Sequence, residues 1–201
     1  MKLINNKLLL FILFFGIVWL NSFIGTNDYA NWWIENILTF ITLIVLVLTY
    51  RYFRFSIKSY FLITLFLCLH VYGSKYTYAE NVFGYGLKDV LQLSRNPYDR
   101  IVHFSFGFLL YLPLKELFKN GLKYPFHLSV SLPVVMVLAL SGGFEILEWL
   151  IADIFFKAHG ESYLGTQGDV WDAQKDMALA FLGSVISFFL FYKMNSVKKT
   201  D

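Results

Sequence analysis

The chain has 201 residues, of which 57% are hydrophobic, 20% are aromatic and only 15% are charged, with a formal net charge of +3. This composition excludes a disordered chain and an ordinary soluble domain, and it is typical of a membrane protein. The single cysteine, Cys68, lies in an apolar run, which excludes a disulfide framework, a cysteine-based metal cluster and thiol exchange.

Apolar runs of about 20 residues, the length that crosses a hydrocarbon core, recur along nearly the whole chain. They predict an all-α fold: a polytopic integral membrane protein whose six transmembrane helices form a single helical-bundle domain over residues 1–201. The first three helices are expected at 7–24, 33–53 and 57–73. The first run has no small-residue cleavage site, so we interpret it as a membrane span and not as a removed signal peptide.

A long segment at 74–98 follows the third helix and contains Gly84, Gly86 and Pro97 together with several aromatic residues. An aromatic segment of this length with glycines is expected to lie in the membrane interface or to dip partly into the membrane, where protein or water must satisfy its backbone. A second long segment, 152–169, is expected between the last two helices.

The last three helices are expected at 99–118, 126–151 and 170–192, and each carries acidic residues near one end. In the first of these, Asp99 and His103 have a spacing of i, i+4. This spacing places a carboxylate and an imidazole on one face of the helix.

The other two helix ends continue this pattern. Glu145 and Glu148 share a face at i, i+3, and Asp169, Asp172 and Asp176 follow one another at the start of the last helix. Ionisable groups at membrane depth are costly and usually line an interior cavity or pathway. We therefore expect the three helix ends to meet in one acidic pocket.

Several of these side chains also have a purely structural interpretation. Asp169 and Asp172 match an N-cap and an N3 acid, and Asp99 matches N3 after an Asn-Pro pair. Negative side chains at these positions satisfy the free amides and the positive dipole end of a helix. Glu145 and Glu148 could be an interfacial pair that reaches toward water.

Asp176 differs because it lies past the first turn of its helix. It is followed at small-residue spacing by Ala180, Gly183 and Ser184, which indicates a close contact with another helix. We therefore expect Asp176 to have a functional role or to belong to a buried network. His103 is expected to have a partner as well, because an intramembrane histidine that faces carboxylates rarely lacks one.

The distribution of charge predicts the orientation in the membrane. With the amino terminus in the cytoplasm, eleven of the 17 lysines and arginines but only two of the 14 acids lie in inner segments. This agrees with the positive-inside rule and places both termini in the cytoplasm. The five tryptophans then fall near outer helix ends, where amphipathic rings prefer the headgroup level. The acidic pocket is thus expected at the outer face.

A carboxylate-rich pocket with one imidazole suits a hard divalent cation such as Mg²⁺, Mn²⁺ or Ca²⁺, or a general base made of a histidine and an acid. Neither HExxH nor GxSxG occurs in the sequence, and no organic cofactor is expected. The resulting hypothesis divides the pocket into catalytic residues and metal ligands. The catalytic residues are His103, Glu145 and Asp176, and the ligands are Asp99, Glu148 and Asp172.

Three runs in the second half of the chain are distinctive. They are NPYDRIVHF at 96–104, FEILEW at 144–149 and LGTQGDVWDAQKDM at 164–177. These runs resemble the YjdF-type family of bacterial inner-membrane proteins, and the likeness extends from about the third predicted helix to the carboxyl end. The resemblance implies a multi-pass protein of the bacterial plasma membrane, in a family without an established biochemical function.

The order of an Asp-x3-His helix start, a Glu-bearing helix and an Asp-bearing last helix is more distantly similar to VanZ-like envelope proteins. Some of those proteins are linked to resistance against glycopeptide antibiotics. Two positions depart from their pattern: Glu148 stands where the motif has Gln, and Ala180 stands where it has Asn. Both departures remove a neutral hydrogen-bonding side chain.

Three functional hypotheses follow. In the first, the pocket holds a divalent cation and His103 acts as acid or base on a lipid-linked or phosphorylated substrate of the cell envelope. In the second, the same groups form a path for ions, protons or small solutes. In the third, the protein is a non-catalytic accessory protein with an inert polar network. The expected partners are the bilayer and a lipid-linked or cationic ligand at the outer face, and no nucleic acid.

Overall fold

The computed structural model describes residues 5–26, 28–155 and 164–197, with side chains up to residue 192. Within these ranges the chain forms seven α-helices and one π-helical turn, and no strand. The central part of the expected 152–169 segment, residues 156–163, lies outside the described residues.

Six of the helices are long and apolar enough to cross a membrane, which confirms the predicted number of spans. A π-helical turn at Leu117–Gly121 extends the fourth of them. The six helices are α1 (Asn6–Ile24), α2 (Tyr29–Thr49), α3 (Ile57–Ser74), α5 (Tyr98–Glu116), α6 (Phe126–Phe155) and α8 (Asp172–Val197).

The bounds of α2 differ from the prediction, because the helix begins at Tyr29 and not at Trp33. Asp28 caps it: its side chain accepts a hydrogen bond of 2.9 Å from the backbone N–H of Asn31. The extra turn buries Trp32 against α1, where its indole N–H donates to the Ser22 hydroxyl at 3.0 Å. Trp32 is thus a core residue, although tryptophans near helix ends were expected at the headgroup level.

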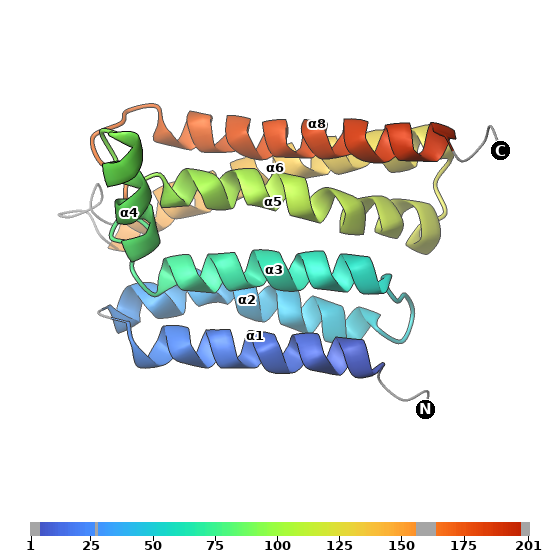
Figure 1. Cartoon of the computed structure of the whole chain (residues 1–201), viewed down its shortest axis with the longest axis horizontal. Helices are drawn as coiled ribbons and strands as arrows, with labels where there is room; N and C mark the ends of the chain where they lie inside the picture. Colours follow the sequence, from blue (N-terminus) through green and yellow to red (C-terminus); the bar gives the residue numbers. More distant parts are fainter. Residues whose placement is uncertain (1–4, 27, 156–163, 198–201) are drawn as a thin grey trace.

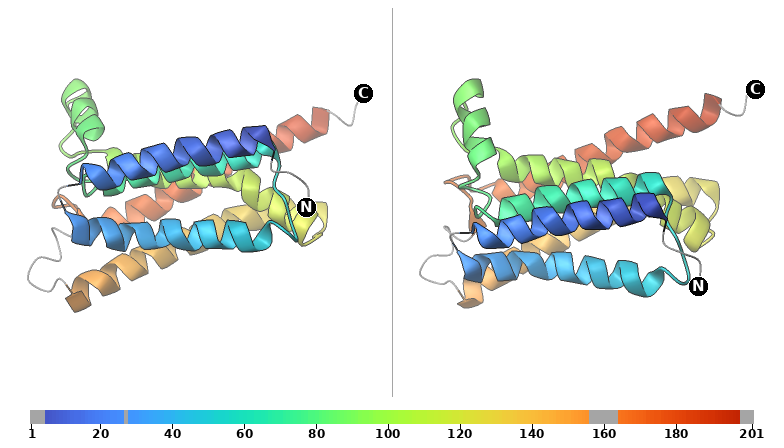
Figure 2. Two further views of the ribbon diagram at one scale, coloured as in Figure 1. Left: turned by 90° about the horizontal axis from the view of Figure 1, so that it is seen from below. Right: turned by 60° about the horizontal axis from the view of Figure 1, so that its bottom comes forward.

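The long helices run side by side along the long axis of the molecule (Figure 1). α1 packs on α3, α3 on α5 and α5 on α8, while α2 packs on α3 and α6 packs on both α5 and α8 (Figure 2). α1 begins and α8 ends at the same end of the bundle, which we call the terminal end. Which side of the membrane this end faces remains a prediction from the charges.

The opposite end of the bundle carries a helix that was not predicted, α4 (Val82–Leu91), so we call it the α4 end (Figure 1). Asn81 caps α4 by accepting a hydrogen bond of 3.1 Å from the N–H of Gly84. Gly84 lies so close to the side chain of Asn96 that an added Cβ would overlap it. An exposed apolar face at the end of a bundle is typical of a helix in the membrane interface. In α4 this face includes Val82, Phe83, Val90 and Leu91.

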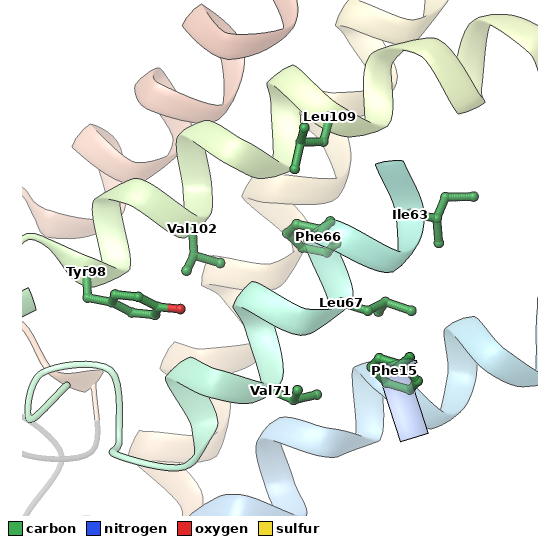
Figure 3. Packing of buried hydrophobic residues seen from close by; sticks show 8 residues of the cluster. All are labelled: Phe15, Ile63, Phe66, Leu67, Val71, Tyr98, Val102 and Leu109. Atoms are coloured by element: carbon green, nitrogen blue, oxygen red, sulfur yellow. The ribbon is translucent and has the colours of Figure 1, made fainter. Parts of the chain in front are cut away.

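The apolar core is centred on α3, which is covered by its neighbours on most sides (Figure 3). Phe66 and Leu67 of α3 pack between Phe15 of α1 and Val102 of α5 within one buried cluster. Because this cluster joins helices from both halves of the sequence, the six spans form one bundle.

α5 and α8 approach each other closely because glycines lie at their crossing. An added Cβ on Gly107 would overlap the backbone carbonyl of Ala180, and one on Gly183 would overlap the carbonyl of Phe104. Small residues allow two membrane helices to pack backbone against backbone. The crossing holds Asp176, which lies one turn before Ala180, against the start of α5.

Candidate functional site

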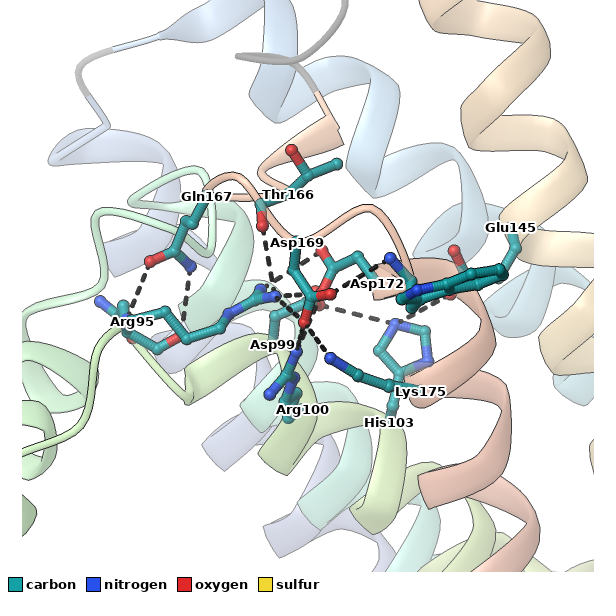
Figure 4. A network of polar contacts seen from close by, with 12 residues as sticks. Arg95, Asp99, Arg100, His103, Glu145, Thr166, Gln167, Asp169, Asp172 and Lys175 are labelled. Carbon is teal, nitrogen blue, oxygen red and sulfur yellow. Dashed lines mark hydrogen bonds and ion pairs between the residues drawn. The ribbon is translucent and has the colours of Figure 1, made fainter.

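The charged residues gather at the α4 end, where α5 and α8 begin and the last turns of α6 pass beside them (Figure 4). Pro97 occupies the N-cap position of α5, so Asp99 is the second residue of the helix and not the third, which was the predicted position. Asn96 precedes Pro97, and its side-chain oxygen accepts a hydrogen bond of 3.0 Å from the N–H of Tyr98. Asp99 and His103 therefore occupy the first two turns of α5.

His103 is buried and lies between carboxylates from two helices. Its Nε2 is 3.5 Å from Oδ1 of Asp99 on α5 and 3.5 Å from Oε1 of Glu145 on α6. The predicted shared face of Asp99 and His103 is confirmed by this geometry. We refer to Asp99, His103, Glu145 and Asp176 as the carboxylate–histidine cluster.

Asp176 reaches the cluster from α8. Its side chain is 2% exposed, and its Oδ1 has no hydrogen-bond partner among the residues that the structure describes. Asp99, His103 and Asp176 each offer one ligand atom, and these three atoms all lie within 4.8 Å of one another. This is the spacing that one metal ion could bridge.

A second set of charges, the ion-pair network, lies beside the cluster and consists of Arg95, Arg100, Asp169, Asp172 and Lys175. The guanidinium of Arg95 makes a double ion pair with the buried carboxylate of Asp172. Nη2 of Arg100 lies 2.5 Å from Oδ2 of Asp169, and Nζ of Lys175 lies 2.6 Å from the same oxygen. Asp169 is therefore shared between two cations.

This shared position has an electrostatic consequence for Asp169, which lies just before α8. The hydrogen bond from Lys175, with further hydrogen bonds from the backbone of Trp171 and from Arg100, lowers the pKa of Asp169 to about 2. Oδ1 of Asp169 also accepts the Trp171 N–H at 3.1 Å, so Asp169 stabilises the turn that precedes α8. Because α8 begins at Asp172, Asp169 does not occupy the N-cap position that was predicted for it, and Asp172 is the first residue of the helix instead of the third.

The two segments that precede α5 and α8 are tied together by a reciprocal contact. The backbone N–H of Asn96 donates to Oε1 of Gln167 at 2.8 Å, and Nε2 of Gln167 donates to the carbonyl of Asn96 at 3.1 Å. Nη1 of Arg95 also donates to the carbonyl of Thr166 at 3.3 Å. These contacts fix the start of α8 relative to the start of α5.

Two further acids extend the negative charge toward α2. Glu148 on α6 is half-buried and interacts electrostatically with Glu35, Asp99 and Glu145. Glu35 on α2 is buried and interacts with Asp99 as well. The carboxylates therefore continue from α8 across α5 and α6 to α2.

The predicted pocket residues thus separate into groups. Asp99, His103, Glu145 and Asp176 come together, Glu148 lies toward Glu35, and Asp172 faces Arg95. The prediction missed Glu35 and the cations Arg95, Arg100 and Lys175. The sequence signal for the three cations was their position inside or directly beside the distinctive runs at 96–104 and 164–177. Glu35 lies outside these runs.

The charges of the two regions do not balance. With the carboxylates ionised and His103 neutral, the carboxylate–histidine cluster carries three negative charges and the ion-pair network carries one net positive charge. In that state the two regions together have a surplus of two negative charges, and ionised Glu35 and Glu148 would add to it. Two carboxylates and an imidazole form a donor set for Mn²⁺ in particular, since carboxylates suit Mg²⁺, Ca²⁺ and Mn²⁺ and imidazole suits transition metals.

Comparison with known proteins identifies relatives over most of the chain. The family model described as Predicted membrane protein (DUF2238) matches residues 7–196. Inner membrane protein YjdF of Escherichia coli (strain K12) is 34% identical over 163 residues, which cover 81% of this chain and 78% of the relative. No solved structure matches the chain. The resemblance to YjdF-type proteins is confirmed, while the more distant similarity to VanZ-like proteins stays a prediction.

Proposed function

The chain belongs to the DUF2238 family of predicted membrane proteins, and on that premise we propose that it is a multi-pass inner-membrane protein that binds a divalent metal ion. The proposed ligands are Asp99, His103 and Asp176. The observation that carries the proposal is the buried Asp176 carboxylate, which has an unpartnered oxygen among the described residues and lies at ligand spacing from the other two side chains.

The physical argument rests on the cost of burying charge. An ionised carboxylate that is removed from water without a partner costs several kcal/mol, so such groups are normally paired, protonated or bound to a metal. Arg95, Arg100 and Lys175 are already engaged by Asp169 and Asp172. With the carboxylates of the carboxylate–histidine cluster and the ion-pair network ionised, one divalent cation would neutralise the surplus of two negative charges that these cations leave.

The roles in this proposal differ from those expected from the sequence. His103 and Asp176 become ligands together with Asp99, and Asp172 becomes a structural partner of Arg95. Glu145 has its Oε1 3.5 Å from Nε2 of His103 and is placed to accept or donate a proton beside the metal. A bound divalent ion would polarise a phosphoryl oxygen and activate a water molecule there.

We propose a lipid-linked phosphorylated compound as the substrate class. Arg100 and Lys175 line a groove of about 340 Å³ that continues along α8 past Ala178, Leu179 and Leu182. Guanidinium and ammonium groups bind phosphate, and the apolar residues below them suit a lipid tail. A phosphate there would share Arg100 and Lys175 with Asp169. It would lie near the carboxylate–histidine cluster, because Arg100 directly follows Asp99 and Lys175 directly precedes Asp176 in the chain.

Ion or proton transport is the second candidate, and a specific observation favours it. The carboxylates of Glu35 and Glu148 extend the carboxylate–histidine cluster toward α2 within the bundle. Chains of intramembrane acids are used as proton and ion paths. In that case Glu145→Gln or Glu148→Gln abolishes a pH-dependent flux in reconstituted vesicles.

The test is metal content and thermal unfolding of the detergent-purified full chain with Mg²⁺, Mn²⁺, Ca²⁺ or Zn²⁺. At about a hundred times the dissociation constant, a bound ion stabilises a protein by about 2.7 kcal/mol, which raises the melting temperature by several degrees. We expect this shift in the wild type and in the control Asp89→Asn, which removes an exposed carboxylate of α4. Asp176→Asn is expected to abolish it.

The substrate class has a separate test. Glu145→Gln is expected to retain the bound metal but to lose release of inorganic phosphate from a phosphorylated lipid. Absence of any ion, with no cation-specific shift in either protein, would refute the metal site and favour a transport or accessory role. Metal binding without turnover of lipid phosphates would refute the substrate class alone.

A further inference from the structure

A second cavity lies at the terminal end of the bundle, whereas the carboxylate–histidine cluster lies at the α4 end. It has a volume of about 510 Å³ and is bounded by α1, α3, α5 and α8. Its lining is mostly apolar and includes Phe11, Phe61, Leu112 and Phe191, but it also contains Lys7 and Lys58. Nothing in the proposed function uses these residues.

The cavity follows from the way in which the helices pack. α1 packs on α3, α3 on α5 and α5 on α8, whereas α1 and α8, over their described residues, have no comparable contact with each other (Figure 2). α3 and α5 therefore form the floor of a groove, and α1 and α8 form its two walls. Phe11 of α1 and Phe61 of α3 meet with ring centroids 5.7 Å apart at the α1 side.

The two lysines lie where a lipid headgroup would be expected. Lys7 and Lys58 both lie in the first turn of their helices, α1 and α3, at the terminal end. Charged side chains at the ends of membrane helices reach the headgroup level, while the helix residues that follow lie at the depth of the acyl chains. The apolar part of the groove thus begins where the hydrocarbon begins.

The two lysines are not paired with an acidic side chain among the described residues. Among the described residues, the ammonium groups of Lys7 and Lys58 have no ion pair or hydrogen bond. The nearby acid Glu116 accepts two hydrogen bonds from Ser56, from its N–H at 2.9 Å and from its hydroxyl at 2.6 Å. Lys115 adds a third cation, with its Nζ 5.8 Å from the ring centroid of Phe191.

We propose that this groove is a binding site for an anionic phospholipid. The phosphate would lie between Lys7 and Lys58, and one acyl chain would follow Phe11, Phe61 and Phe191. Basic pockets between membrane helices bind anionic headgroups, and an apolar wall below the cations gives a phospholipid contacts that a soluble anion does not make. The site is independent of the carboxylate–histidine cluster and lies at the opposite end of the bundle.

The test compares retention of phosphatidylglycerol and phosphatidylcholine by the full chain in detergent, using native mass spectrometry and thermal unfolding. We expect selective retention of phosphatidylglycerol by the wild type. The double variant Lys7→Gln, Lys58→Gln is expected to bind it roughly 30-fold more weakly, since each cation near a membrane surface contributes about fivefold. The matched control is Arg51→Gln with Lys119→Gln, which removes the same charge from exposed positions at the same end.

A variant in the groove distinguishes lipid binding that needs the acyl-chain site from binding by positive charge alone. Leu112→Phe keeps every charge but narrows the groove, and it is expected to reduce retention of phosphatidylglycerol while the control variant retains it. Equal losses in the lysine variant and the control would overturn the proposal, because charge alone would then explain binding. Equal retention of the two lipids by the wild type, or displacement of the lipid by inorganic phosphate, would overturn it as well.

Discussion

The ion-pair network and the carboxylate–histidine cluster lie side by side at the α4 end, yet their carboxylates have different surroundings. In the network, Asp169 and Asp172 each lie within 4.0 Å of at least two cationic side chains. In the cluster, Asp99 and Glu145 share one imidazole, and Asp176 has an oxygen without a partner among the described residues. The acids of the network are paired with cations of the protein itself, whereas the acids of the cluster are left for a ligand to neutralise.

This difference indicates that the two regions have different roles. The network connects the segment before α5 to the segment before α8, so it positions the two helix starts. The cluster uses those positions to bring buried acids from α5, α6 and α8 together. Variants that affect one region should therefore behave differently from the same substitutions in the other.

The largest effect is expected for Arg95→Ala in the ion-pair network. Removing one partner of a buried ion pair leaves an uncompensated charge, which costs about 3–5 kcal/mol. Arg100 still lies 3.4 Å from Asp172, so we expect a loss near 3 kcal/mol in the free energy of unfolding. Unfolding in mixed micelles measures this loss, and Asp172→Asn in the same chain should restore part of it. An unchanged stability would show that the pair does not hold the fold.

The two regions are compared most clearly by the same substitution, aspartate to asparagine, made once in each region. In metal-free protein, Asp172→Asn should lower the free energy of unfolding by about 2 kcal/mol, because Arg95 loses its charged partner. At a pH where Asp176 is ionised, Asp176→Asn should raise the free energy of unfolding by about 1 kcal/mol, because the neutral amide removes a buried charge whose Oδ1 has no hydrogen-bond partner among the described residues. The two stability measurements check the opposite signs. Equal destabilisation by both variants would mean that Asp176 is an ordinary member of a packed polar network.

A smaller effect is expected for Gln167→Ala. The variant removes two hydrogen bonds to the backbone of Asn96, and neutral hydrogen bonds of this kind contribute about 1 kcal/mol. Amide hydrogen exchange should become faster at Asn96 and at the start of α8, while the rest of the bundle keeps its protection. Unaltered exchange at Asn96 would contradict the reciprocal contact.

The smallest effect concerns the pH dependence of Asp169. Its folded pKa of about 2 lies below the ordinary value of 3.8, so its contribution to stability is present above pH 4 and is lost as the pH falls toward 2. Stability measured between pH 4 and pH 2 should show this loss in the wild type and a weaker one in Lys175→Gln. A wild-type profile that Lys175→Gln does not change would rule out this hydrogen bond as the main cause.

Much of the fold was predictable because it depends on local composition. Apolar runs place all six spans, and the small residues after Asp176 indicate the tight crossing of α8 with α5. α4 was missed because Gly84 and Gly86 are poor helix formers. Its helix depends on contacts of Asn81 and Asn96, which lie outside the helix itself and are visible only in three dimensions.

The candidate site was predictable only in part. Spacings of three and four residues along one helix correctly place Asp99 and His103 on a shared face. Which residues neutralise the acids depends on contacts across more than 70 positions, such as Arg95 with Asp172. Helical periodicity gives no information on such long-range pairs. The sequence alone therefore does not show which acid is paired with a cation and which is not.

The most direct test of the account is electron paramagnetic resonance of Mn²⁺ added to the detergent-purified full chain. A bound ion with an imidazole ligand shows electron spin echo modulation from the ligand nitrogen. The account predicts one bound Mn²⁺ per chain with this modulation, loss of the modulation in His103→Gln, and loss of the ion in Asp176→Asn. A wild-type protein that binds no Mn²⁺, or binds it without nitrogen modulation and equally well in Asp176→Asn, would contradict the proposed metal site.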